Sequence, residues 1–160
     1  MESPSTAHEH SLYFLGDKAC DTVPLRRCRY LMELCEQEGD FLSFESSPEL
    51  LSCYARDAQG LHARLPLLVF RPFTLKNVPT FLKNCHHLDM PVTLRGAGTG
   101  LAGGCVPAVE GVILLTAHLK GIRDYDPLKG TLIVEPGVTV RELNRYVEAD
   151  RWHFPLSMAT

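Results

Sequence analysis

Glycine is concentrated in one ten-residue stretch of this chain, RGAGTGLAGG, which runs from Arg95 to Gly104 and contains five glycines. The stretch directly follows the apolar run Val92-Thr93-Leu94, which predicts a short strand. Glycine accepts backbone conformations that other residues avoid, and it leaves room for another group beside the main chain. We therefore expect a loop at the end of a strand, with a polar group held against its backbone.

Two familiar glycine motifs do not explain this loop. The segment from Gly98 to Gly103 has the spacing GxGxxG, but a dinucleotide-binding loop of that type needs a helix that starts inside the glycines, and Gly103-Gly104-Cys105-Val106-Pro107 cannot continue a helix. The acidic residue expected roughly 20 residues later is missing as well. A P-loop is excluded because no Lys-Ser/Thr pair follows the glycines.

The remaining explanation is an anion site formed by the amides of the loop itself. Successive N–H groups in glycine-permitted conformations make a concave nest for phosphate. We expect the Thr99 hydroxyl to add a donor and Arg95 to supply positive charge. The competing interpretation is a structural glycine-rich turn with Arg95 in a surface salt bridge.

Composition limits the classes of function. The chain has 160 residues, of which 45% are hydrophobic and 22% charged, and this supports one globular domain with a core. A net charge of −3 gives no electrostatic case for binding nucleic acid. No apolar run approaches the roughly 20 residues that cross a bilayer, and residues 1–10 lack the apolar core of a signal peptide. We therefore expect a cytoplasmic protein with no transmembrane segment.

Cysteine and histidine predict neither a disulfide framework nor a metal site. None of the seven histidines stands at a persuasive ligand spacing, and no two cysteines form a CxxC pair. We expect buried free thiols. The six cysteines are Cys20, Cys28, Cys35, Cys53, Cys85 and Cys105.

The first half of the chain alternates helical and strand patterns. Apolar residues at helical spacing predict three helices: from Thr22 and Pro24 to Gly39, from Ser47-Pro48 through Tyr54, and from near Asn77 to Leu88. Continuous apolar runs predict buried strands at residues 67–70 and 112–115, in addition to 92–94. A strand–helix–strand unit of this kind predicts a parallel, right-handed connection.

The second half follows a different pattern. Residues 122–125 and 131–134 predict a hairpin around the Pro/Gly turn at residues 126–130. A helix then begins after Thr139, which forms a capping box with Glu142. The two halves together predict an α+β fold.

The glycine loop and its surroundings resemble the flavin-linked oxidases of the vanillyl-alcohol oxidase type, which have a PCMH-type FAD-binding domain. Within them, the resemblance is greatest to the flavin subunit of glycolate oxidase and to the D-lactate and D-2-hydroxyacid dehydrogenases. The similar segments stand in order between residues 45 and 160: LPLLVFRP (65–72), MPVTLRGAGTGLAGGCVP (90–107), GVILLTAHLKGI (111–122), LIVEPGVTVRELNRYV (132–147) and FPLSMAT (154–160).

This resemblance implies two small α/β subdomains, a parallel βαβ half followed by a mainly antiparallel half, with FAD between them. Residues 1–44 would form an N-terminal arm and helix. Residues 45–160 would be the N-terminal portion of the FAD-binding domain, truncated before the substrate domain. We therefore expect the N-terminal part of a longer flavoenzyme.

The resemblance also implies which residues meet FAD. The amides of Gly96 through Leu101 would cradle the pyrophosphate, and Thr99 stands where some family members carry a histidine bonded to the flavin, so we expect noncovalent FAD. Pro155 and Leu156 would border the flavin. The expected cofactor-binding residues are Arg95, Gly96, Ala97, Gly98, Thr99, Gly100, Leu101, Gly103, Gly104, Pro155 and Leu156.

The activity implied by the resemblance is oxidation of a small 2-hydroxy acid, of the glycolate or D-lactate type, to a 2-oxo acid. The flavin would take a hydride from the substrate, and electrons would pass to a separate acceptor subunit, which could hold the protein at a membrane. No catalytic residue stands out in residues 1–160. Two alternatives stay open: a non-catalytic flavin-binding remnant or half-domain that needs a partner chain, and an enolpyruvyl-glucosamine reductase, whose first loop normally reads differently.

Overall fold

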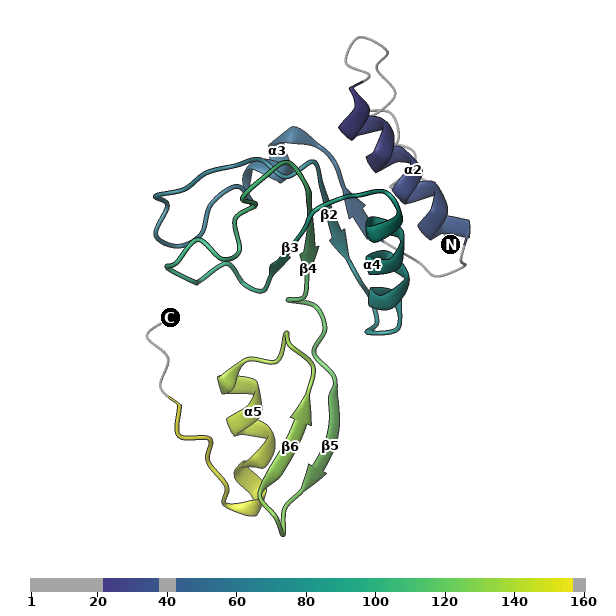
Figure 1. Ribbon diagram of the computed structural model, residues 1–160. Helices are drawn as coiled ribbons and strands as arrows, with labels where there is room; N and C mark the ends of the chain where they lie inside the picture. The colour runs from purple at the N-terminus through teal and green to yellow at the C-terminus, as the bar shows by residue number, and fades with distance from the viewer. Residues whose placement is uncertain (1–21, 38–42, 157–160) are drawn as a thin grey trace, which may run out of the picture.

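The computed structural model describes residues 22–37 and 43–156 (Figure 1). The N-terminal arm expected before the first helix lies outside these residues, and so do Cys20 and the expected helix end at Gly39. We call residues 22–37 with 43–115 the sheet half and residues 122–156 the hairpin half. Among the described residues, no helix combines the length and the apolar character needed to cross a membrane.

Four strands form the larger sheet, in the order β1-β2-β4-β3. Their bounds are Ser43–Glu45 for β1, Leu68–Arg71 for β2, Val92–Arg95 for β3 and Val112–Leu115 for β4. Strands β2, β4 and β3 run parallel, whereas β1 pairs antiparallel with β2 at one edge. The predicted parallel arrangement is confirmed, with β4 inserted between the two strands of the strand–helix–strand unit. The edge strand β1 is not among the predicted elements.

Helices cover both faces of this sheet (Figure 1). Helices α2 (Val23–Gln37) and α4 (Asn77–His87) lie on one face, and the short helix α3 (Pro48–Ser52) contributes Leu51 to the other. A hydrophobic core lies on each face of the sheet, and strand β2 contributes to both. Phe70 packs on the face covered by α4, whereas its neighbour Val69 packs with Leu51 on the other face. The ring of Phe70 stacks on that of Phe81, with 4.1 Å between centroids. The continuous apolar runs are therefore strands buried on both faces, as predicted.

The boundaries of two helices follow from local contacts. Helix α4 starts at Asn77, as predicted. The Asn77 Oδ1 accepts hydrogen bonds from the N–H and the hydroxyl of Thr74. Helix α3 ends at Ser52, two residues before the predicted end. Ser47 has the extended backbone of an N-cap but makes no side-chain cap bond. Its N–H donates to Glu45 Oε1 at 3.1 Å.

The cysteines divide between core and surface. Cys28, Cys35 and Cys85 are buried free thiols, as predicted, and burial raises the pKa of Cys28 and of Cys85 to about 12. The prediction is wrong for Cys53, which is exposed, and Cys105 is only half-buried. Both lie outside the apolar faces of helices, Cys53 at the end of α3 and Cys105 in the glycine loop.

The hairpin half has two layers. Strands β5 (Ile122–Asp126) and β6 (Thr131–Val134) pair antiparallel, and α5 (Val140–Val147) with the 3-10 turn η2 (Glu148–Asp150) lies beside them (Figure 1). The predicted capping box is confirmed, because the Glu142 N–H donates to the Thr139 hydroxyl at 3.2 Å and the Thr139 N–H donates to Glu142 Oε2 at 2.8 Å. The antiparallel hairpin of the second half is confirmed too.

A short junction joins the two halves. The connection from β4 to β5 packs against the residues that follow β6, where the Gly137 N–H donates to the Leu119 carbonyl at 2.8 Å. A side chain on Gly137 would come within 2.6 Å of the Thr116 carbonyl. The buried carboxylate of Glu135 accepts from the Gly121 N–H at 2.7 Å and pairs with Arg123. The hydrogen bond from the Gly121 N–H, and after it the Arg123 side chain, hold the pKa of Glu135 below its usual value.

Candidate cofactor site

The glycine loop leaves β3 at Arg95 and follows an irregular path, without helix or strand, over residues 96–111. Two of its glycines have the positive φ that side chains rarely adopt, +76° at Gly98 and +75° at Gly103. A Cβ on Gly98 would collide with the Arg95 guanidinium, and one on Gly103 would lie 3.4 Å from the His62 ring. The fold of the chain itself thus requires glycine at these two positions.

The other glycines of the loop have no such requirement. Gly96, Gly100 and Gly104 do not have positive φ, and a Cβ on any of them would meet no atom within 4 Å. A side chain at these positions would fill open space beside the main chain. This is the arrangement expected where a ligand approaches the backbone, and it fits the FAD implied by the resemblance.

Arg95 is not placed as the interpretation of a structural turn with a surface salt bridge predicts. Arg95 is 7% exposed, so it is not on the surface. Its Nη1 donates to the carbonyls of Tyr54 at 3.3 Å and Cys105 at 3.4 Å. The guanidinium also lies 5.7 Å from the centre of the Tyr54 ring, a cation–π distance. The surface salt bridge is therefore wrong. Arg95 supports the loop from inside, against Gly98, and direct contact with FAD stays a prediction.

A cleft of about 940 Å³ lies between the glycine loop and the hairpin half. Four of the expected cofactor-binding residues line it together: Gly96, Ala97, Thr99 and Leu156. The segment after η2 runs back along α5 toward the larger sheet and so brings Leu156 to this cleft (Figure 1). The remaining expected residues are not part of its lining: Arg95, Gly98, Gly100, Leu101, Gly103, Gly104 and Pro155.

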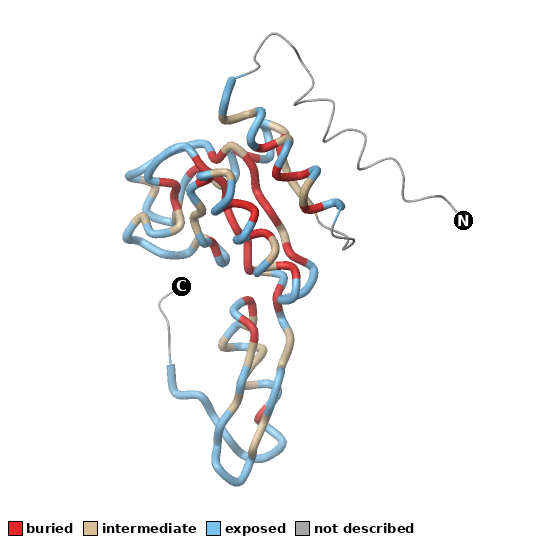
Figure 2. Tube along the Cα trace, turned by 45° about the vertical axis from the view of Figure 1, so that its right-hand side comes forward, coloured by how far each residue is buried: buried red, intermediate tan, exposed pale blue. Residues whose placement is uncertain are grey.

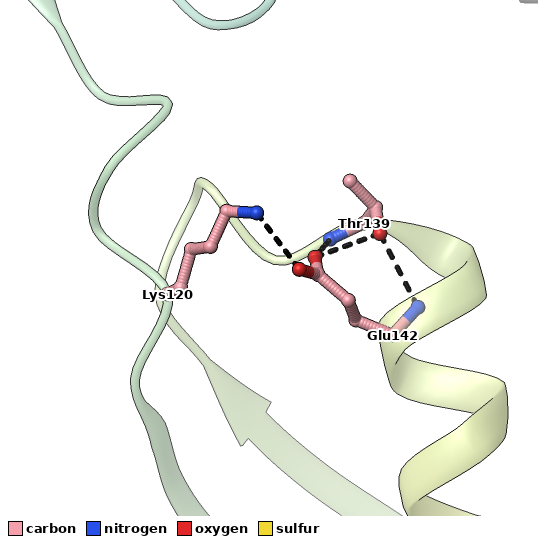
Figure 3. Close-up of polar contacts among 3 residues, drawn as sticks. All are labelled: Lys120, Thr139 and Glu142. Carbon is pink, nitrogen blue, oxygen red and sulfur yellow. Dashed lines mark hydrogen bonds and ion pairs between the residues drawn. The ribbon is translucent and has the colours of Figure 1, made fainter.

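The opposite wall of the cleft carries charged residues that sequence reasoning missed. Lys120, Arg141 and Arg145 line it, together with the capping box of α5. Lys120 Nζ lies 2.7 Å from Glu142 Oε1, while Glu142 Oε2 accepts hydrogen bonds from Thr139 (Figure 3). The hydrogen bond from Lys120 is the main reason that the pKa of Glu142 falls to about 2. The sequence predicted the capping box, but no sequence pattern indicated its contact with Lys120.

The chemistry of this cleft suits an anionic ligand with apolar parts. Backbone of a glycine loop faces cationic side chains across it, and Ala117, Val138 and Leu156 add apolar surface. Among the described residues, no three His, Cys, Asp or Glu side chains come together as metal ligands. The cleft therefore has the character of a binding site for a large cofactor.

Comparison with a family model gives the same assignment. The model described as "FAD binding domain" matches residues 66–160. The match includes the whole glycine loop and every residue that lines the cleft.

Curated relatives and solved structures extend this comparison. The glycolate oxidase subunit GlcD of Escherichia coli (strain K12) is 38% identical over 112 residues, which cover 70% of this chain and 22% of that protein. The mitochondrial D-2-hydroxyglutarate dehydrogenase of Rattus norvegicus is 32% identical over 91 residues, 57% of this chain and 17% of that protein. The matched part of the chain thus spans less than a quarter of the length of these relatives.

The fold is shared with a protein of lower sequence identity. The crystal structure of p-cresol methylhydroxylase with bound substrate superposes with a TM-score of 0.65 at 20% sequence identity. The superposed region covers 82% of this chain and 26% of that chain. This likeness agrees with the predicted two-part α+β fold, in which a parallel sheet is followed by an antiparallel one.

Proposed function

Because this chain belongs to the FAD binding domain family, we propose that it is the FAD-binding portion of a flavin-dependent oxidoreductase that oxidises a small 2-hydroxy acid to a 2-oxo acid. Glycolate and D-lactate are the expected type of substrate. Two relatives support this choice by name, a glycolate oxidase subunit and a D-2-hydroxyglutarate dehydrogenase. As one of them is a subunit, we include a separate electron-acceptor subunit in the proposal.

The observation that carries the proposal is the open space beside Gly96. This glycine lines the cleft, yet neither its φ nor any neighbouring atom of the chain requires glycine there. The backbone of Gly96, Ala97 and Thr99 would hold the pyrophosphate of FAD through its amides. Thr99 offers no imidazole for a covalent bond to flavin, so the proposal is noncovalent FAD.

The other residues of the cleft would bind and orient the cofactor. Arg141 and Arg145 bring positive charge to the wall opposite the glycine loop, and Leu156 adds an apolar surface for the cofactor to pack against. Bound FAD would supply the two-electron acceptor for the substrate, while the protein positions it. A cytoplasmic location and the division into residues 1–44 and 45–160 stay predictions.

FAD binding and turnover test the proposal. Isothermal titration calorimetry with FAD on the full-length protein should give a saturable 1:1 complex, and D-lactate or glycolate should reduce a dye acceptor. We expect residues 1–160 alone to bind FAD weakly and to catalyse nothing, because the match covers only 22% of the glycolate oxidase subunit and a cofactor normally buries most of its surface in a formed site.

The outcomes separate the candidate functions. Binding with turnover in the full-length protein supports the proposal. Binding without turnover on any 2-hydroxy acid supports the flavin-binding remnant instead. No FAD binding in the full-length protein would overturn both.

A further inference from the structure

The glycine loop is held by a second loop that lies outside the family match. This second loop, residues 55–64, follows α3 and precedes the matched residues 66–160. Its ends are tied together by the Arg64 N–H, which donates to the Ala55 carbonyl at 3.0 Å. The two loops lie side by side at one end of the larger sheet (Figure 1).

Asp57 accepts hydrogen bonds within the second loop and from the glycine loop. Its Oδ1 accepts from the N–H groups of Gln59 at 3.1 Å and Gly60 at 3.0 Å, which forms a local turn. Its Oδ2 accepts from the Gly103 N–H at 2.8 Å, across 46 residues of sequence. One half-buried carboxylate therefore fixes the second loop and the glycine loop at the same time.

A second bond joins the two loops close to the cleft. The Ala58 N–H donates to the Gly100 carbonyl at 3.3 Å. Gly100 directly follows Thr99, which lines the cleft. The loop contacts at residues 100 and 103 thus lie immediately after the part of the glycine loop that faces the cleft.

Asp57 is suited to hold the loop rather than to touch the cofactor. Backbone hydrogen bonds, first from Gly60 and then from Gly103, hold the pKa of Asp57 below its usual value, so the side chain is a carboxylate at neutral pH. A carboxylate repels a diphosphate and would weaken binding by direct contact. Its hydrogen bond to Gly103 instead orders a long loop that has no helix or strand of its own, and an ordered site costs less entropy to occupy.

We propose that Asp57 is a positioning residue for the cofactor loop: by accepting the Gly103 amide proton it fixes the loop in the conformation that receives FAD. The proposal rests on the proposed function, since it takes FAD as the ligand. It places a residue that supports binding outside the part of the chain that the family model matches.

The test is Asp57→Asn, with Asp126→Asn as the matched control. The asparagine has one carbonyl oxygen, so it can keep the local turn or the Gly103 bond but not both. Asp126 forms the same turn, with Oδ1 accepting from Leu128 at 3.0 Å and Lys129 at 3.1 Å, but its second oxygen pairs with Lys129 Nζ and does not reach the glycine loop. The two substitutions are therefore chemically equal and differ in the loop that they affect.

We expect Asp57→Asn to weaken FAD binding by the full-length protein about tenfold, and Asp126→Asn to change it by less than about twofold. In the protein without FAD, Asp57→Asn should speed amide hydrogen exchange at Gly103, while the melting temperature stays that of the control. A purely structural role would lower the melting temperature and leave the affinity of the folded protein unchanged. Affinity is measured well below the melting temperature of each variant.

Unchanged exchange at Gly103 together with unchanged FAD affinity would overturn the proposal. Faster exchange with weaker binding supports it. If the unsubstituted full-length protein holds no FAD, the proposed function fails, and a difference in Gly103 exchange still shows whether Asp57 orders the loop.

Discussion

The sheet half and the hairpin half are stabilised to very different degrees. In the sheet half, Phe70, Phe81 and Ile113 are completely buried and the sheet is covered on both faces. Among the described residues of the hairpin half, Val147 is the one buried hydrophobic side chain, and Ile133 is 59% exposed. Most of the hairpin half is exposed or intermediate in Figure 2. The sheet half therefore has its own core, whereas the hairpin half depends on its junction and on what fills the cleft.

A large-to-small substitution in each half tests this difference directly. We expect Phe70→Ala to lower the free energy of unfolding by about 3–5 kcal/mol, because its ring is fully buried against Phe81. Leu143→Ala, at a half-buried position of α5, should lower the free energy of unfolding by about 1 kcal/mol. Urea unfolding followed by circular dichroism measures both. Equal losses would mean that the two halves share one cooperative core.

Two glycines of the same loop sharpen the comparison. Gly98→Val should destabilise the sheet half by about 1–3 kcal/mol, because it strains a positive φ and collides with buried Arg95. Gly96→Val should leave the melting temperature unchanged and weaken FAD binding by about tenfold or more, because its side chain would point into open space in the cleft between the halves. Thermal melts and calorimetric FAD titration on the two variants separate the effects. Tight FAD binding by Gly96→Val would show that the cofactor does not approach this backbone.

The smallest expected effect is the pH response of the hairpin half. Glu142 has its pKa lowered to about 2 from the ordinary 4.5, so its stabilising contacts with Lys120 and Thr139 are complete above pH 4.5 and are lost as pH falls through about 2. The side chain is 40% exposed, so solvent weakens this contribution. NMR titration should give Glu142 a midpoint near 2, and Lys120→Met should raise it. A midpoint near 4.5 in the unsubstituted protein would contradict the ion pair drawn in Figure 3.

Local patterns were sufficient to predict most elements of both halves. The apolar runs of β2 and β4, the start of α4 at Asn77 and the capping box at Thr139 each depend on residues within a few positions of one another. The glycine loop was likewise recognisable from its own composition. Predicted contacts of this short range are confirmed because their physical cause lies within the same segment.

The contacts that support the loop had no local signal. Arg95 reaches Tyr54 across 41 residues, Asp57 reaches Gly103 across 46, and Lys120 reaches Glu142 across 22. Each pair is brought together only by the packing of the sheet and the junction. Sequence reasoning therefore found the loop that we propose receives the cofactor, but not the side chains that hold this loop in place.

The position of Trp152 makes the two halves optically distinguishable. It is the one tryptophan of the chain, its ring lies 3.0 Å from where a side chain on Gly130 would begin, and its Nε1 donates to the Pro127 carbonyl. Its intrinsic fluorescence therefore reports on the hairpin half alone, with no tryptophan signal from the sheet half. Loosening of the hairpin turn would change this emission while the sheet half is still folded.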